Sequence, residues 1–199
     1  MTDILNYLSG LTQGYYGAFW ERVDEVRMED HNIMYTSTTG TNKDKDQHID
    51  MMFQYGVGGR VYTSDTKGPR KTLEQDRYCD DIPLEFINRN GKRGSLVGDQ
   101  DFINQYVVDD NDKFWLYQFN REQLETWARK KVSTTNGHYY TLRCVGNGKL
   151  MWAPLVDVIA PRTEVSYSKY DVDDYVTQVY HEVLQNGIDS IKRLNPRGF

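Results

Sequence analysis

The chain has 199 residues, of which 38% are apolar and 13% aromatic, including 15 tyrosines. This length supports one domain with a proper core, and the composition excludes an intrinsically disordered chain, which would be poor in aromatic residues. The formal net charge of −5 counts against a protein that coats nucleic acid non-specifically, because such binding needs many lysine and arginine contacts to phosphate. An enzyme with a local basic surface remains compatible with this charge.

The sequence carries no signal for a membrane or an export pathway. No apolar run approaches the ~18–20 residues that cross a bilayer, and the first residues lack the basic start and cleavage site of a signal peptide. The two cysteines, Cys79 and Cys144, are too few for a zinc site or a disulfide framework. We therefore expect no membrane partner and a cytoplasmic location, in the host cell if the protein is viral.

The N-terminal part predicts helix followed by a series of strands. Apolar residues recur at three- and four-residue spacing from about Thr2 to Asp30, as in an amphipathic helix. Gly14 and Gly17 weaken its middle, so two helices or one bent helix are expected. A polar stretch over 35–47 predicts an exposed loop. Strand patterns follow at Ile49–Tyr55, Arg60–Ser64, Ile82–Asn88, Gln105–Val108 and Phe114–Phe119.

The C-terminal part mixes helix and hairpin signals. It contains a helix over Arg121–Lys131 with Asn120 as its cap, a hairpin over His138–Val145 and Leu150–Ile159, and a final helix from Asp171 to about Gly187. The order of elements predicts a mixed α/β core over 1–132 and a hairpin-helix extension over 133–199 that packs on this core.

The chemistry concentrates in the segment from Gln47 to Lys67. Asp50 stands at the head of one predicted strand, and Asp65 and Lys67 stand at the end of the next, after a Gly-rich turn. Asp65 and Lys67 are two residues apart, so an extended strand projects both side chains from one face. Carboxylate oxygens are the ligands that a hydrolytic Mg²⁺ site needs, and an ammonium beside them can orient a water or offset charge on a phosphate.

An aspartate on one strand followed by Asp-x-Lys on the next, after a helix with a glutamate, resembles the PD-(D/E)XK, or restriction-endonuclease-like, nuclease superfamily. Two departures from the family pattern are present: Ile49 stands where a proline usually precedes the aspartate, and Asp65 replaces the more frequent glutamate. The resemblance implies a mixed β-sheet flanked by helices, in which the segment from Ile82 to Phe86 looks like the third core strand. Gly94 to Val108 resembles the helix and strand that follow.

The resemblance also implies site residues and a cofactor. It assigns Asp50 and Asp65 to binding Mg²⁺ or Mn²⁺ and Lys67 to catalysis, and it matches Glu21 to a helix glutamate that adds to the metal site in many members. Glu85 is either a further acidic group of the site or a solvent-facing residue, since strand alternation places it opposite Ile82 and Leu84.

The predicted partner is nucleic acid, with DNA as the expected substrate, contacted by basic residues that cluster after the second and third predicted strands. For each cluster a solvated loop is the alternative interpretation. A homodimer is compatible with this function, because enzymes of this kind often cut both strands as a pair. The residues expected to contact nucleic acid are Arg60, Arg70, Lys71, Lys92 and Arg93.

Two other functions are compatible with the same pattern. The first is a non-catalytic binding protein or inhibitor, of the type found in phages, on a degenerate nuclease fold, whose acidic surface would serve protein contact. The second is a structural subunit that assembles through its C-terminal hairpin and helix. A site able to hold a divalent cation separates the enzyme from both alternatives.

Overall fold

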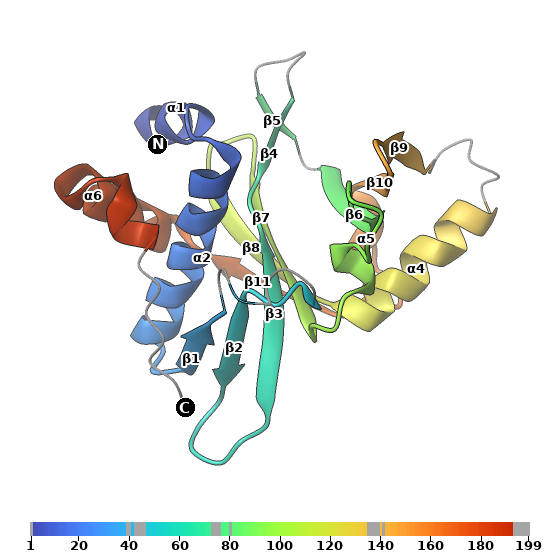
Figure 1. The fold of residues 1–199 in the computed structure, drawn as a ribbon, viewed down its shortest axis with the longest axis horizontal. Helices are drawn as coiled ribbons and strands as arrows, with labels where there is room; N and C mark the ends of the chain where they lie inside the picture. Colours follow the sequence, from blue (N-terminus) through green and yellow to red (C-terminus); the bar gives the residue numbers. More distant parts are fainter. Residues whose placement is uncertain are drawn as a thin grey trace.

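The computed structural model describes residues 2–38, 41, 47–72, 77–79, 81–134, 140 and 142–192. Its centre is a six-stranded mixed sheet with strand order β1-β2-β3-β7-β8-β11 (Figure 1). All neighbours in this sheet pair antiparallel except β3 and β7, which run parallel. The strands are β1 (Met34–Ser37), β2 (Met51–Gln54), β3 (Val61–Lys67), β7 (Phe102–Val108), β8 (Phe114–Asn120) and β11 (Tyr167–Asp171).

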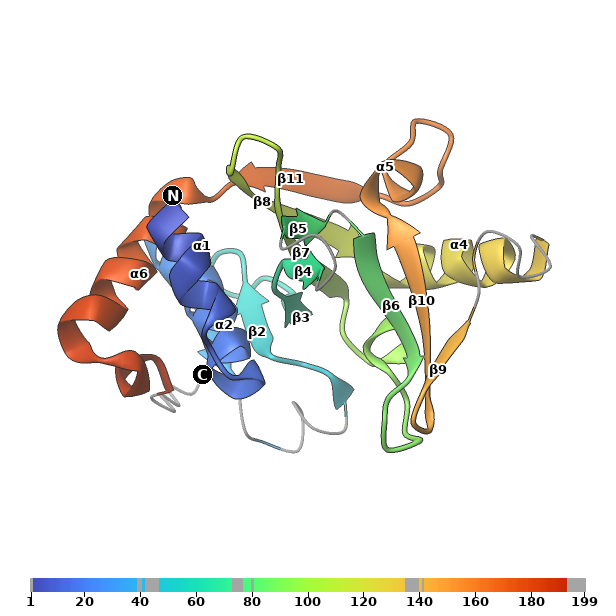
Figure 2. The same ribbon diagram turned by 90° about the horizontal axis from the view of Figure 1, so that it is seen from above.

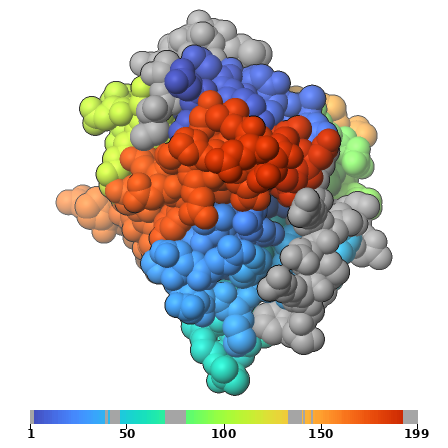
Figure 3. All heavy atoms as spheres, turned by 90° about the vertical axis from the view of Figure 1, so that its left-hand side faces the viewer, coloured from blue at the N-terminus to red at the C-terminus, as the bar shows by residue number. Residues whose placement is uncertain are grey.

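Helices α1 (Thr2–Ser9), α2 (Gln13–Asp30) and α6 (Asp173–Asn186) cover one face of this sheet. Figure 3 shows α6 lying across α1 and α2 on this side of the molecule. Burial of apolar surface between the helices and the sheet stabilises the arrangement. The shared core contains Phe19, Trp20, Val23, Tyr106, Phe114, Leu116, Val176 and Val179, all 0% exposed.

The other face packs against a second layer, seen beside the central sheet in Figure 2. This layer holds a three-stranded sheet with order β6-β10-β9 and the helices α4 and α5. Its core joins Ile103 and Phe119 of the central sheet to Leu84, Leu124 and Met151. The elements are β6 (Asp81–Ile87), β9 (Arg143–Val145), β10 (Gly148–Pro154), α4 (Arg121–Thr134), α5 (Leu155–Val158) and the short 3₁₀ helix η1 (Ser95–Val97).

The mixed sheet flanked by helices that the sequence predicts is confirmed. The N-terminal helical region is indeed two helices, although the break falls at 10–12 and both weakening glycines lie inside α2. The side chain of Asn120 caps α4 as expected, since its Oδ1 accepts the backbone N–H of Gln123 at 3.0 Å. The final helix ends at Asn186, next to the expected Gly187, which has a φ of +81°. Two short edge strands, β1 and β11, were not expected.

One predicted strand belongs to a different sheet. The segment from Ile82 to Phe86 is not the third strand of the central sheet, because β6 pairs with β10 in the second layer. Strand β7 takes the expected place instead and pairs in parallel with β3. The physical reason lies in the buried side chains of β6, since Ile82 and Leu84 pack against Met151 and Leu124 of the second layer.

Strand pairing crosses the division expected at 132 and 133. Strand β10 pairs with β6, and β11 pairs with β8, so strands from beyond residue 133 complete both sheets. A separate two-stranded ribbon, β4 (Arg70–Thr72) with β5 (Arg77–Cys79), follows β3. None of the described helices is long and apolar enough to cross a membrane.

Candidate metal and catalytic site

Strand β3 presents Asp65 and Lys67 to the second layer and Thr66 to helix α2. The Thr66 hydroxyl donates a hydrogen bond to Asp24 Oδ2 of α2 at 2.7 Å. Successive side chains of a strand point to opposite faces, so the residues on either side of Thr66 project away from α2. Asp65 and Lys67 therefore share one face of the sheet, as the sequence predicts.

Asp50 directly precedes β2, the neighbour of β3 in the sheet, and lies against this part of β3. Its side chain is 7% exposed, and its Oδ2 accepts the backbone N–H of Thr66 at 2.7 Å. Its carbonyl accepts the backbone N–H of Thr38 at 2.9 Å, which anchors the residue from the other side. Asp50 is thus held by backbone groups of both flanking segments next to the strand that carries Asp65.

Burial raises the pKa of Asp50 well above its ordinary value, and the negative charge of Asp65 raises it further. Glu21 adds to this effect, while Lys67 and the Thr66 N–H act in the opposite direction without cancelling it. Two buried carboxylates that repel each other favour the uptake of positive charge, either as a proton or as a cation. Asp50 and Asp65 therefore act on each other electrostatically.

Lys67 supplies part of this positive charge. Its Nζ donates to Asp65 Oδ1 at 2.8 Å, and its side chain keeps 31% of its surface exposed. Burial acts to lower the pKa of Lys67, but the charges of Asp65, Asp50 and Glu85 outweigh it, so the pKa lies above its ordinary value. Lys67 is consequently an ammonium at neutral pH and a hydrogen-bond donor, not a base.

The second oxygen of Asp65 is buried without a partner among the residues that the structure describes. Asp65 is 2% exposed, and its Oδ2 accepts no hydrogen bond from any described residue. An unpaired buried carboxylate oxygen is costly, so such an atom calls for an explanation. A hard divalent cation fits, because Mg²⁺ binds through one or two carboxylates and leaves its other positions to water and substrate phosphate.

The site is a two-carboxylate arrangement and not a cage. Within the described ranges, no group of three or more His, Cys, Asp and Glu side chains is placed to hold a metal ion. Of the further acidic residues expected here, Glu21 of α2 is half-buried and acts electrostatically on Asp50. Glu85 of β6 is also half-buried and acts on Lys67. Both approach the pair from separate elements.

The basic residues expected to contact nucleic acid have different surroundings. Arg60 forms an ion pair with Asp101 at 2.5 Å and lies over the Tyr62 ring at 5.0 Å. The guanidinium of Arg93 pairs with Asp99 at 3.0 Å, so each arginine is balanced by an aspartate. Lys92 is exposed in the turn after β6. The side chains of the two remaining candidates, Arg70 and Lys71, lie outside the described part of the chain.

Sequence reasoning missed Asp24 and Thr66. Asp24 is fully buried beneath the strand that carries the candidate catalytic residues, and Thr66 joins it to Asp50. A signal was available, because Asp24 stands four residues after Trp20 and four before Met28, both 0% exposed. An aspartate on the apolar face of a helix needs hydrogen-bonding partners. Asp24 could therefore have been predicted from the sequence as the centre of a buried polar cluster.

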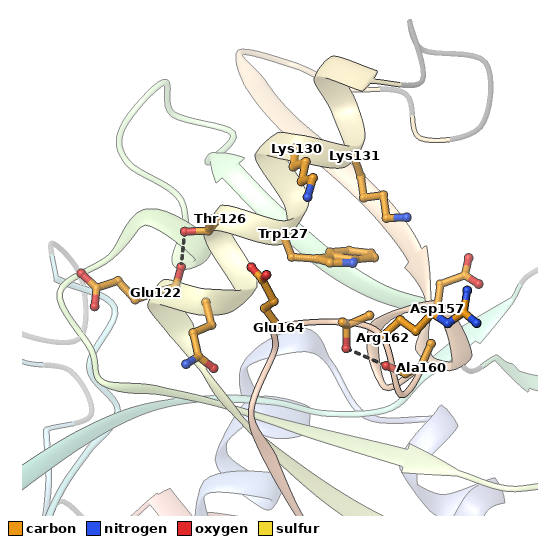
Figure 4. A pocket seen from close by; sticks show the side chains of 11 residues that line it. Glu122, Thr126, Trp127, Lys130, Lys131, Asp157, Ala160, Arg162 and Glu164 are labelled. Carbon is orange, nitrogen blue, oxygen red and sulfur yellow. Dashed lines mark hydrogen bonds between the residues drawn. The ribbon is translucent and has the colours of Figure 1, made fainter.

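A separate groove of about 570 Å³ lies between α4 and the turn after α5 (Figure 4). Its lining includes Trp127, Lys130 and Lys131 of α4 and Asp157 and Arg162 on the opposite side. None of the acidic residues or the lysine predicted for the metal site lines this groove.

Comparison with known proteins gives one structural likeness. No family model matches the chain, and no curated protein matches it. A solved structure described as a bacterial homing endonuclease, I-Ssp6803I, superposes with a TM-score of 0.44 and 16% sequence identity. The superposition covers 92% of this chain and 99% of the other. A TM-score below 0.5 carries no argument about function, so membership of the PD-(D/E)XK superfamily stays a prediction.

Proposed function

We propose that the chain is a nuclease that depends on a divalent cation and hydrolyses phosphodiester bonds, with DNA as its substrate. The observation that carries this proposal is the buried carboxylate of Asp65, which lies next to Asp50. Its Oδ2 has no hydrogen-bond partner among the described residues, and its Oδ1 accepts from the Lys67 ammonium at 2.8 Å. A cation, a phosphate and an attacking water need these three kinds of group in one place.

Each residue has a role that follows from its surroundings. Asp50 and Asp65 would hold Mg²⁺ or Mn²⁺, since both are buried and the charge of Asp65 raises the pKa of Asp50. When bound, such a cation acts as a Lewis acid and lowers the pKa of water. Lys67 remains protonated because of its carboxylate neighbours, so it would donate a hydrogen bond to the attacking water or to a phosphate oxygen. Glu85 and Glu21 would add negative charge around this centre.

The test is cleavage of plasmid, duplex, single-stranded and branched DNA and of RNA, with Mg²⁺ or Mn²⁺. We expect the wild-type chain to cleave DNA, and Asp65→Ala and Lys67→Ala to lose about 100-fold or more of the rate, because each removes a group that acts on the charge developing at the phosphate. Asp110→Ala, in the turn between β7 and β8, and Lys169→Ala, on the edge strand β11, remove exposed residues of the same types outside the site and should cleave at the wild-type rate.

Equal cleavage by wild type, Asp65→Ala and Lys67→Ala would contradict the proposal and point to a contaminant or a different site. A wild-type chain that binds DNA but cleaves none of these substrates with either cation would favour the non-catalytic binding protein instead. Association that depends on concentration, without binding or cleavage, would favour the structural subunit.

A further inference from the structure

A buried polar cluster lies on the opposite face of β3 from the candidate catalytic residues. Its centre is the carboxylate of Asp24, which is 0% exposed in the middle of α2. Oδ2 of Asp24 accepts hydrogen bonds from Thr66 Oγ1 at 2.7 Å and from Asn104 Nδ2 at 3.0 Å. Oδ1 accepts from the Tyr106 hydroxyl at 2.8 Å and from the Arg27 guanidinium at 3.5 Å.

The two donors to Asp24 Oδ2 come from neighbouring strands of the central sheet. Thr66 of β3 and Asn104 of β7 are register partners, and both donate to the same oxygen of Asp24. Gln118 of β8 is in turn the register partner of Asn104 and donates to its side-chain oxygen at 3.0 Å. The carboxylate of Asp24 therefore binds one end of a polar row, Thr66, Asn104 and Gln118, that runs across three strands.

A polar row in this position needs a reason, because apolar side chains surround it. Trp20 and Val23 of α2 and Phe114 of β8 are 0% exposed in the same core. A buried carboxylate costs free energy unless its hydrogen bonds are complete, and apolar residues of similar volume would often be no less stable. A role beyond packing is consistent with keeping Asp24.

Thr66 connects this row to the candidate site. While its hydroxyl binds Asp24, its backbone N–H donates to Asp50 Oδ2 at 2.7 Å. A shift of a strand by one residue moves every side chain to the opposite face, which here would take Asp65 and Lys67 away from Asp50. The bond to Asp24 opposes this shift, because it holds the side chain of Thr66 on the α2 side.

We propose that Asp24 is a positioning residue that acts through Thr66. It holds β3 so that the Thr66 N–H orients the Asp50 carboxylate and Asp65 and Lys67 stay together on the other face. This inference rests on the proposed metal-dependent nuclease. Neither Asp24 nor Thr66 touches the cation or the substrate, so their effect reaches the site only through the geometry of β3.

The experiment removes the Thr66 hydroxyl and leaves its backbone in place. Thr66→Val should weaken Mn²⁺ binding about 10- to 100-fold, the usual consequence of losing a group that orients a metal ligand. Calorimetric titration of the DNA-free protein with Mn²⁺ measures this directly. The rate constant kcat should fall with it, while KM for DNA stays constant, because Thr66 is 9% exposed. Thr66→Ser, which keeps the hydroxyl, should bind Mn²⁺ like wild type.

Two control variants separate positioning from stability. Ser64→Ala changes the same strand on the same face, but the buried Ser64 hydroxyl binds no described residue, so Mn²⁺ affinity should not change. Tyr106→Phe removes another donor to Asp24, on the oxygen that Thr66 does not use. It should lower the unfolding temperature while Mn²⁺ affinity stays near wild type. A network that only stabilises the fold would make Thr66→Val and Tyr106→Phe behave alike.

Wild-type Mn²⁺ affinity in a folded Thr66→Val would overturn this inference and leave the proposed function standing. A more than tenfold loss in Thr66→Ser would overturn it as well, and that variant decides the question should Thr66→Val not fold. If the wild-type chain itself binds no Mn²⁺ and cleaves no nucleic acid, the proposed function fails, which is a distinguishable outcome.

Discussion

At the scale of single residues, the main feature of the candidate site is the carboxyl of Asp50, whose negative charge is unfavourable in the folded chain. Burial and the charge of Asp65 raise the pKa of Asp50, whereas an unfolded chain leaves it near its ordinary value of about 3.9. The folded state therefore binds a proton more tightly than the unfolded state. This contribution to stability is fully present below the unfolded pKa and is lost as the pH rises through the folded pKa.

Asp50→Asn tests this account of the charge. The amide keeps an acceptor for the Thr66 N–H but carries no charge, so in EDTA the variant should melt at a higher temperature than wild type at pH 8. Each kcal/mol regained corresponds to about 2–4 °C in a chain of this size. The difference should shrink towards pH 4, where Asp50 of the wild type takes up a proton. Thermal melts followed by circular dichroism measure both values.

The exposed Asp110→Asn serves as a reference and should leave the melting temperature unchanged at both pH values. An Asp50→Asn variant that is less stable than wild type at pH 8, or that shows the same difference at both pH values, would contradict the electrostatic interpretation.

At the scale of elements, the position of β3 depends on close contact with α2 just beyond the site. Gly68 follows Lys67, and a Cβ atom there would lie 2.4 Å from Trp20 Cδ1 and 2.5 Å from Tyr16 Cε1. Trp20 is 0% exposed and packs against the rings of Phe19, Tyr106 and Phe114, so it has no room to move aside. Glycine at this position lets the end of the strand approach the helix.

Gly68→Ala should therefore destabilise the chain by about 1–3 kcal/mol, the usual cost of forcing an extra carbon into a packed core. It should also lower the cleavage rate, because Lys67 precedes it directly. Urea unfolding measures the first effect. Gly14→Ala in α2 is the matched control: its Cβ meets no atom within 4 Å, so this change should stabilise the helix by about 0.5–1 kcal/mol. Wild-type stability of Gly68→Ala would show that the contact is looser than the structure places it.

At the scale of the whole molecule, the C-terminal third completes the layers around the central sheet. Strand β11 closes one edge of that sheet, and α6 covers its helical face. Strand β10 pairs with β6 to form the second layer. The buried side chains that this third contributes include Met151, Ala153, Val158, Val176, Val179 and Val183.

A chain limited to residues 1–132 should consequently not fold cooperatively. Fully burying an apolar side chain of this size contributes about 1.5–3 kcal/mol, so losing five or six of them removes an amount comparable to the ~5–15 kcal/mol that stabilises a domain. We expect a broad urea transition and no dispersed amide spectrum, against a sharp transition for the full chain. A sharp transition of the 1–132 chain would instead establish it as an independent core.

Local patterns in the sequence predicted much of the fold and the placement of Asp65 and Lys67 on one strand face. The spacing of apolar residues predicts α2 and α6. The cap at Asn120 and the strong helix formers after it predict α4, and that cap is confirmed. The pairing of Asp65 with Lys67 on one strand face could be predicted because side-chain alternation depends only on neighbouring residues. The role of the acidic residues in binding a cation stays a prediction.

By itself, the sequence determined the periodicity of its elements and which charged side chains share a face, because both depend on residues a few positions apart. The tertiary structure alone decided that β6 pairs with β10, that β7 lies beside β3, and that Asp24 meets Thr66 across 42 positions of the chain. These choices depend on which buried faces pack together, and packing depends on side chains distant in the sequence. The polar row across β3, β7 and β8 is the clearest result of that choice, since the row and the Asp24 that binds it come from four separate elements.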